Sequence, residues 1–124
     1  MNVAGDLVLT WDGDLVITVG QRKDVATRLE AGRVAFNDGD FFRAHELWED
    51  AWRKLDGTPR LLAQGLIQVA AGLHHVQSDR FPPGARLLVK GLDKLDRGAA
   101  AVPDGLRVDL LARAVSVLLT RLPP

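Results

Sequence analysis

The chain contains no cysteine among its 124 residues, and this absence removes several classes of chemistry. Without cysteine there is no disulfide framework, no thiolate nucleophile and no cysteine-based metal site. The absence is compatible with a reducing compartment. The sequence also lacks a glycine-rich phosphate loop and a serine nucleophile elbow, so nucleotide hydrolysis and triad hydrolysis are disfavoured.

An excess of charge of either sign is also missing. Lys plus Arg and Asp plus Glu number 16 each, so no global field attracts polyanions or anionic membranes. The N-terminal apolar runs are interrupted by Asp6, Asp12 and Asp14, which is unlike a secretory signal, and we expect a cytoplasmic protein. The longest uncharged run, residues 61–78, contains glutamines, histidines and glycines, so it predicts a buried helix and no membrane span.

The only strand signal lies near the N-terminus. Residues 7–19 are two runs rich in β-branched residues around Asp12 and Gly13, a pair that suits a two-residue hairpin turn. A lone hairpin is marginal in water, so we expect it to pack on the helices or to pair with a second copy. We assign residues 1–20 to this hairpin extension and residues 21–124 to a helical domain.

Helical periodicity dominates the remainder of the chain. Apolar residues at three- and four-residue spacing, with capping and proline signals, predict five helices over residues 24–37, 40–55, 58–78, 82–98 and 104 to the terminal prolines. The third should be covered on both sides because its residues 61–78 carry no charge. The predicted fold is therefore all-α, a compact bundle of about five helices in one domain.

Polar residues interrupt the second and third predicted helices. His45 and Glu49 are neighbours on a helix surface, as are Glu46 and Glu49. On the third helix Gln64, Gln68 and His75 fall near one line, with His74 about a quarter turn away. The geometry permits these two sets to face each other, although the spacing leaves open which of His74 and His75 faces the second helix.

Two functional interpretations of this polar cluster are open. Two histidines and a carboxylate form a known zinc set, so His45, Glu49 and His74 or His75 could hold one divalent metal. Without a metal, the same residues could act as an acid–base pair, with Glu46 and Gln68 as further candidates. A di-iron site is disfavoured because no Glu-x-x-His pair is present.

A structural interpretation competes with these and ranks above them. Glu49 and Arg53 have the spacing of an exposed ion pair, and a buried imidazole more often donates to a carbonyl or carboxylate than binds a metal. Trp48 and Trp52 share a helical face and are expected in the core. A basic stripe on the fourth helix could touch phosphates, but Asp93 and Asp96 interleave with it, which favours a solvated face. Its residues are Arg86, Lys90, Lys94 and Arg97.

Two stretches carry a family resemblance. The sequence FNDGDFFRAHELWEDAW at residues 36–52 and LAQGLIQVAAGLHH at residues 62–75 resemble domain-of-unknown-function family 309, over roughly residues 25–98. That family looks like small all-helical proteins of bacteria and archaea with no assigned reaction or ligand. The resemblance implies that the polar cluster belongs to the family motif, together with motif residues Phe36, Asn37, Gly39, Phe41, Trp48, Trp52, Gln64 and Gly65.

Three functions remain open from the sequence. The first is a non-catalytic interaction or scaffold domain, homo-oligomeric with a dimer favoured, whose polar cluster specifies packing. The second is a metal-dependent or acid–base enzyme that works on a small molecule at that cluster. The third is nucleic-acid binding through the fourth helix, which the interleaved acidic residues disfavour.

Overall fold

The computed structural model describes residues 7–11 and 23–124, and within these residues the secondary structure is helical. The elements are α1 (Lys23–Asn37), α2 (Phe41–Trp52), α3 (Gly57–Gln77), α4 (Phe81–Arg97), η1 (Ala99–Ala101) and α5 (Val108–Arg121). This confirms the predicted all-α domain of five helices. Among the described helices, none is both long enough and apolar enough to cross a bilayer.

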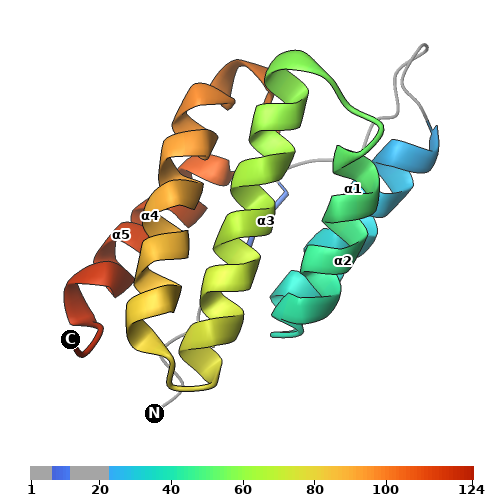
Figure 1. Ribbon diagram of the computed structural model, residues 1–124. Coiled ribbons are helices and arrows are strands. Elements are labelled where there is room, and N and C mark those ends of the chain that lie inside the picture. The colour runs from blue at the N-terminus through green and yellow to red at the C-terminus, as the bar shows by residue number, and fades with distance from the viewer. Residues whose placement is uncertain (1–6, 12–22) are drawn as a thin grey trace.

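The helices form two layers. In Figure 1, α2, α3 and α4 lie side by side, α1 lies behind α2, and α5 lies behind α4. Residues 7–11 pass behind α3. Because α3 packs on both α2 and α4, the prediction that it is covered on two sides is confirmed. Between the layers lies one core, whose largest fully buried side chains are Trp48, Phe36, Phe41, Leu9, Leu73, Leu88, Leu111, Val69 and Val115.

Local signals place the helix starts. The Asp40 side chain accepts a hydrogen bond from the backbone N of Arg43 at 3.1 Å, which caps α2 as its sequence predicted. Gly39 before it has φ +81°, a backbone conformation that L side chains rarely adopt. The helix α4 begins at Phe81 with the proline pair in its first turn, where a missing N–H costs nothing.

Glycines let α3 and α4 approach closely. A Cβ on Gly65 would lie 2.8 Å from the backbone N of Leu95, and one on Gly98 would lie 2.6 Å from the backbone N of Leu62. Both distances are shorter than real Cβ contacts, and the opposing atoms are backbone that cannot move aside. The backbones of these two helices are therefore in direct contact, which fixes the position of α3 in its layer.

The fifth helix begins later than its sequence predicted. Asp104 was expected to cap it, but α5 begins at Val108, and Asp104 lies in a turn with Gly105 at φ +87°. The expected helical residue Leu106 instead forms an isolated antiparallel bridge with Trp11. Since the backbone N of Arg107 donates to the carbonyl of Thr10 at 2.9 Å, this tertiary contact holds the chain extended and delays the helix.

The predicted N-terminal hairpin is not confirmed. Its first arm, residues 7–11, is extended and packs on the helices, which is one of the two arrangements expected for the hairpin. The pairing described for this arm is only the bridge from Trp11 to Leu106. The turn and second arm, residues 12–19, lie outside the described residues.

Candidate functional sites

The seam between α2 and α3 holds the first half of the predicted polar cluster. His45 Nε2 lies 3.6 Å from Glu49 Oε2, with the two side chains 30% and 35% exposed. The other oxygen of Glu49 accepts from Arg53 Nη2 at 2.9 Å, so the predicted Glu49–Arg53 ion pair is present. Glu46, by contrast, is exposed to solvent. Glu49 is therefore shared between an imidazole in the seam and a guanidinium at the surface.

The two adjacent histidines of α3 diverge. His74 faces α2, where its ring lies 5.5 Å from the ring of Phe42, and Phe42 in turn lies 6.3 Å from the ring of His45. His75 instead faces the turn into α4, where its Nδ1 accepts a hydrogen bond from Arg80 Nε at 2.9 Å. Desolvation lowers the pKa of His75, and the charges of Arg80 and His74 lower it further.

These positions do not assemble the predicted metal set. The Phe42 ring contacts both His45 and His74, and His75 belongs to the α4 side. Over residues 7–11 and 23–124, no three histidine or acidic side chains are grouped so that they could hold a metal ion. The arrangement that the structure does build is the His45–Glu49 pair alone.

The seam also contains polar atoms without a hydrogen-bond partner among the described residues. They are His45 Nδ1 and Trp52 Nε1 on α2 and Gln68 Oε1 on α3, all buried at the atom level. Each such atom costs of order 1–3 kcal/mol when desolvated and unpaired. Gln64 is half-buried on the same helix as Gln68.

The two tryptophans of α2 have different environments. Trp48 is 1% exposed, and its Nε1 donates to the carbonyl of Leu29 in α1 at 2.9 Å. Trp52 is half-buried, and the Arg60 guanidinium lies 3.9 Å from its ring centroid. Trp48 is thus a core residue as predicted, whereas Trp52 sits at the margin of the core beneath a cation.

The basic stripe on α4 is interleaved with carboxylates, as its sequence indicated. Arg97 Nη1 lies 3.6 Å from Asp93 Oδ2, and these side chains are 55% and 61% exposed. An exposed pair of this kind is screened by salt and contributes little. This part of α4 is therefore a mixed-charge surface.

A second site lies on the opposite side of α3, where residues 7–11 are held by α1. The Asn37 side chain accepts from the backbone N of Leu9 at 2.7 Å and donates to its carbonyl at 3.0 Å. Arg33 Nη1 donates to the same carbonyl at 3.1 Å. One helix thus satisfies both backbone groups of an extended residue, which is what a neighbouring β-strand would do.

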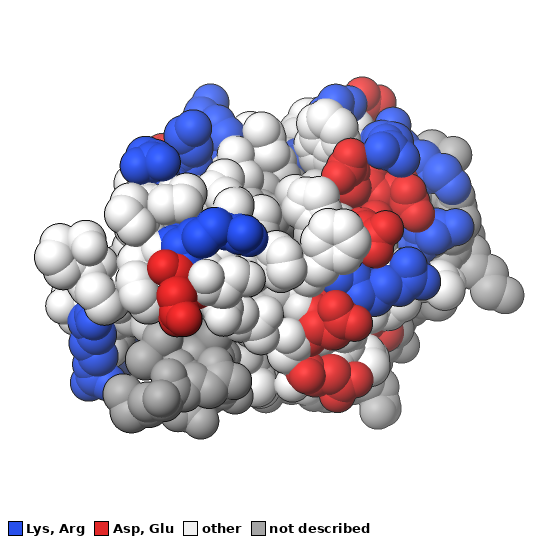
Figure 2. Space-filling model, turned by 60° about the horizontal axis from the view of Figure 1, so that its bottom comes forward, with Lys and Arg blue, Asp and Glu red and all other residues white. Residues whose placement is uncertain are grey.

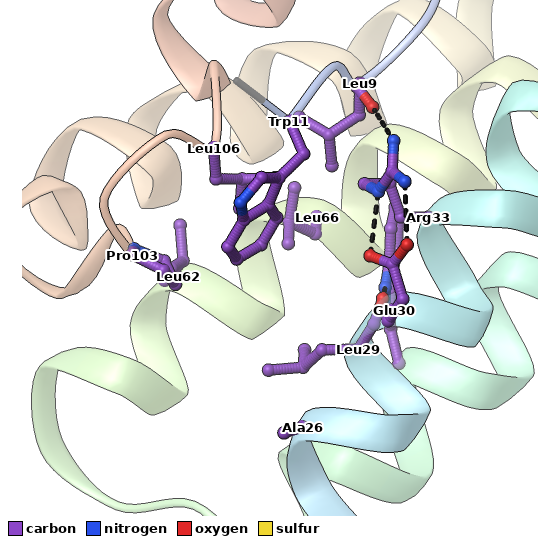
Figure 3. Close-up of a pocket in the computed structure, with 11 residues that line it drawn as sticks. Leu9, Trp11, Ala26, Leu29, Glu30, Arg33, Leu62, Leu66, Pro103 and Leu106 are labelled. Atoms are coloured by element: carbon purple, nitrogen blue, oxygen red, sulfur yellow. Dashed lines mark hydrogen bonds and ion pairs between the residues drawn. The ribbon is translucent and has the colours of Figure 1, made fainter. Parts of the chain in front are cut away.

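Beside this contact is a small cavity of about 80 Å³ (Figure 3). Its lining residues are Leu9, Trp11, Ala26, Leu29, Glu30, Arg33, Trp48, Leu62, Leu66, Pro103 and Leu106. The charge of Arg33 is balanced by Glu30, whose carboxylate it contacts at 2.7 and 2.8 Å, and this hydrogen bonding raises the pKa of Arg33. Trp11 Nε1 is buried and has no partner among the described residues.

Sequence reasoning missed the role of these residues. Asn37 was singled out only as part of a motif, and Arg33 was not singled out at all. The available signal was the apolar character of residues 7–9 and Trp11, which requires a surface to pack on. No periodic pattern in α1 indicates that its last turns would provide that surface.

Comparison with known proteins identifies a family for this helical core. An uncharacterized protein from Aquifex aeolicus (strain VF5) is 34% identical over 83 residues, which cover 66% of this chain and 24% of that relative. No solved structure matches the chain. Residues 29–87 match the domain of unknown function DUF309, inside the range of 25–98 that the resemblance predicted. Over these residues, a little under half of the chain, the sequence belongs to the DUF309 family.

Proposed function

We propose that the chain is a non-catalytic interaction domain that pairs with a second copy of itself through the outer surface of α3. This surface consists of the half-buried residues of α3 beyond its first turn, which are Leu61, Gln64, Ile67, Gln68, Ala71, His74 and His75. The observation that supports the proposal is that, after Arg60 in the first turn of α3, none of the half-buried residues of this helix is an acid, a lysine or an arginine.

Charge distribution favours a second copy as the partner. Acidic and basic side chains gather densely on the α1 and α2 side of the molecule, and a largely uncharged surface lies beside them (Figure 2). In a two-fold dimer the same patch of both copies is in contact, so a patch with charge of one sign would repel itself. An uncharged surface with amide and imidazole groups has no such penalty.

An exposed aromatic side chain adds to this argument. Phe42 at the edge of the seam is 54% exposed. A docked helix would remove the Phe42 ring from water. The relative from Aquifex aeolicus is consistent with a module, because the matched region is a quarter of its length.

The alternative of an acid–base enzyme has weaker support. The imidazole of His45 already faces Glu49 through Nε2, and its remaining nitrogen, Nδ1, is buried. A substrate would have to reach that buried nitrogen, because a general acid or base works within hydrogen-bond distance of the proton it moves. The pair is better suited to orienting His45 within a packed seam.

The test is the mass in solution of the full chain by sedimentation equilibrium. We expect a wild-type dimer and a monomer for Ala71→Glu, which places a carboxylate in the middle of the α3 surface. Val89→Glu is the matched control, since Val89 is a 57% exposed residue of α4, and it should remain dimeric. A folded wild-type chain that is monomeric at every concentration would overturn the proposal.

A further inference from the structure

Residues 7–11 lie in the structure as a bound peptide would lie. Leu7 and Leu9 are 6% and 1% exposed, whereas Val8 between them is 43% exposed. This alternation with a period of two is that of an extended chain with one face buried. The segment passes behind α3 in Figure 1, and it contacts α1 on one side and the residues before α5 on the other.

The contacts that hold the segment recognise its backbone. Asn37 bonds both the N–H and the carbonyl of Leu9, Arg33 bonds the same carbonyl, and the backbone of Arg107 donates to Thr10. Main-chain hydrogen bonds combined with pockets for alternate side chains are the mode by which extended peptides bind to sheet edges. Here a helix terminus and a loop supply the main-chain partners.

The segment fills its site imperfectly at one end. The cavity of about 80 Å³ lies against Trp11, and the indole Nε1 of Trp11 is buried without an acceptor among the described residues. In Figure 3 the Trp11 ring lies between Leu106 and Leu66 at the edge of this space. An occupant with an aromatic side chain that carries no N–H at this position would avoid the unpaired donor.

Most residues that form the site lie within the family match, whereas the segment that occupies it does not. Asn37, Arg33, Leu62 and Leu66 all lie within residues 29–87, which match the family. Residues 7–11 lie outside that match. Much of the receptor surface is therefore family sequence, whereas the segment that occupies it is not.

We propose that the groove formed by α1, α3 and the residues before α5 is a binding site for extended apolar peptides, which residues 7–11 occupy as a tethered ligand. The preferred peptide has apolar side chains at alternating positions, with an aromatic residue at the fifth. Its backbone is recognised by Asn37 and Arg33. Because the tether holds residues 7–11 at a high local concentration, a free peptide binds weakly until the segment is displaced.

Hydrogen exchange on the wild-type full chain tests displacement directly. The probe is a synthetic peptide with the sequence of residues 7–11 between glycine–serine flanks. Since the Leu9 N–H is bonded to Asn37, adding the peptide should accelerate exchange at Leu9, with no acceleration in the middle of α3. Unchanged exchange at Leu9 with millimolar peptide would contradict the proposal.

Binding of the same peptide, carrying a fluorophore, tests the groove by anisotropy. Leu9→Asp should empty the groove and bind the peptide at least about ten-fold more tightly than the wild type. Val8→Asp, which alters an exposed side chain of the same segment, should bind as the wild type does. Adding Asn37→Ala to Leu9→Asp should weaken binding by about ten-fold or more.

Circular dichroism of each variant accompanies these measurements. If Leu9→Asp is unfolded, Leu9→Ser replaces it in the same comparison. A folded Leu9 variant that binds the peptide no more tightly than Val8→Asp would overturn the proposal, as would equal binding with and without the Asn37 side chain.

Discussion

At the scale of single residues, the two tryptophans of α2 show how one hydrogen bond decides how much a side chain contributes to stability. Trp48 donates its indole N–H to Leu29, whereas the N–H of Trp52 is buried without a partner among the described residues. Removing a satisfied donor loses a bond, but removing an unsatisfied one loses nothing of that kind.

We therefore expect Trp48→Phe to lower the free energy of unfolding by about 1–3 kcal/mol. Trp52→Phe, its matched control, should change that free energy by less than about 1 kcal/mol, because the replacement retains a ring beneath Arg60. Urea denaturation of the two variants measures the difference. Equal destabilisation would show that the bond to Leu29 contributes nothing.

The His75 side chain supplies a dependence of stability on pH. Burial, Arg80 and His74 lower its pKa in the folded state below the usual 6.5. As the pH falls through 6.5 towards that lower pKa, the unfolded chain binds more protons at this position than the folded chain, so stability falls. Above 6.5 this contribution is fully present.

His75→Gln removes this titration and keeps a group that can accept from Arg80. On going from about pH 7.5 to about pH 5.5, the melting temperature of the wild type should fall more than that of the variant. Thermal unfolding followed by circular dichroism at both pH values measures this. Parallel changes in the two proteins would contradict the assigned shift.

At the scale of elements, the contact of α3 with α4 depends on the absence of side chains. In an ordinary helix, replacing glycine by alanine stabilises by about 1 kcal/mol. At Gly65 the added Cβ would lie 2.8 Å from the backbone N of Leu95, which belongs to the facing helix.

We expect Gly65→Ala to destabilise the fold by about 1–3 kcal/mol, because the two helices must separate to admit the methyl group. Urea denaturation decides which effect is larger. A lower midpoint means that the packing clash outweighs the gain in helix propensity. A more stable variant would mean that α4 moves without cost.

At the scale of the whole molecule, residues 7–11 join parts of the chain that are distant in sequence. Leu9 belongs to the same core as Phe36 of α1 and Leu111 of α5. The core on this side of α3 thus depends on a segment outside the helices. Loss of the segment's contacts should therefore destabilise both α1 and α5.

Leu9→Ala should cost about 2–4 kcal/mol in urea denaturation, and the exposed neighbour Val8→Ala should stay within about 0.5 kcal/mol of the wild type. Hydrogen exchange should then accelerate in α1 and in α5 together. If exchange accelerated only in residues 7–11, the segment would be a peripheral attachment to an otherwise independent bundle.

The sequence by itself determined the helices, because periodicity, capping residues and proline or glycine signals act over a few neighbouring residues. It also carried the resemblance to DUF309, which residues 29–87 match, and it determined the i,i+4 contacts of Glu49 with His45 and Arg53. These features require only the local geometry of one helix.

Only the tertiary structure decided features that depend on how helices are rotated and which distant segments meet. It placed His74 towards α2 and His75 towards α4, a difference of one helical step that no spacing resolves. It also moved the start of α5 to Val108, since a long-range bond to Thr10 outweighs the local capping signal of Asp104. Likewise, Asn37 became the partner of Leu9 because packing brings together two residues that are 28 positions apart.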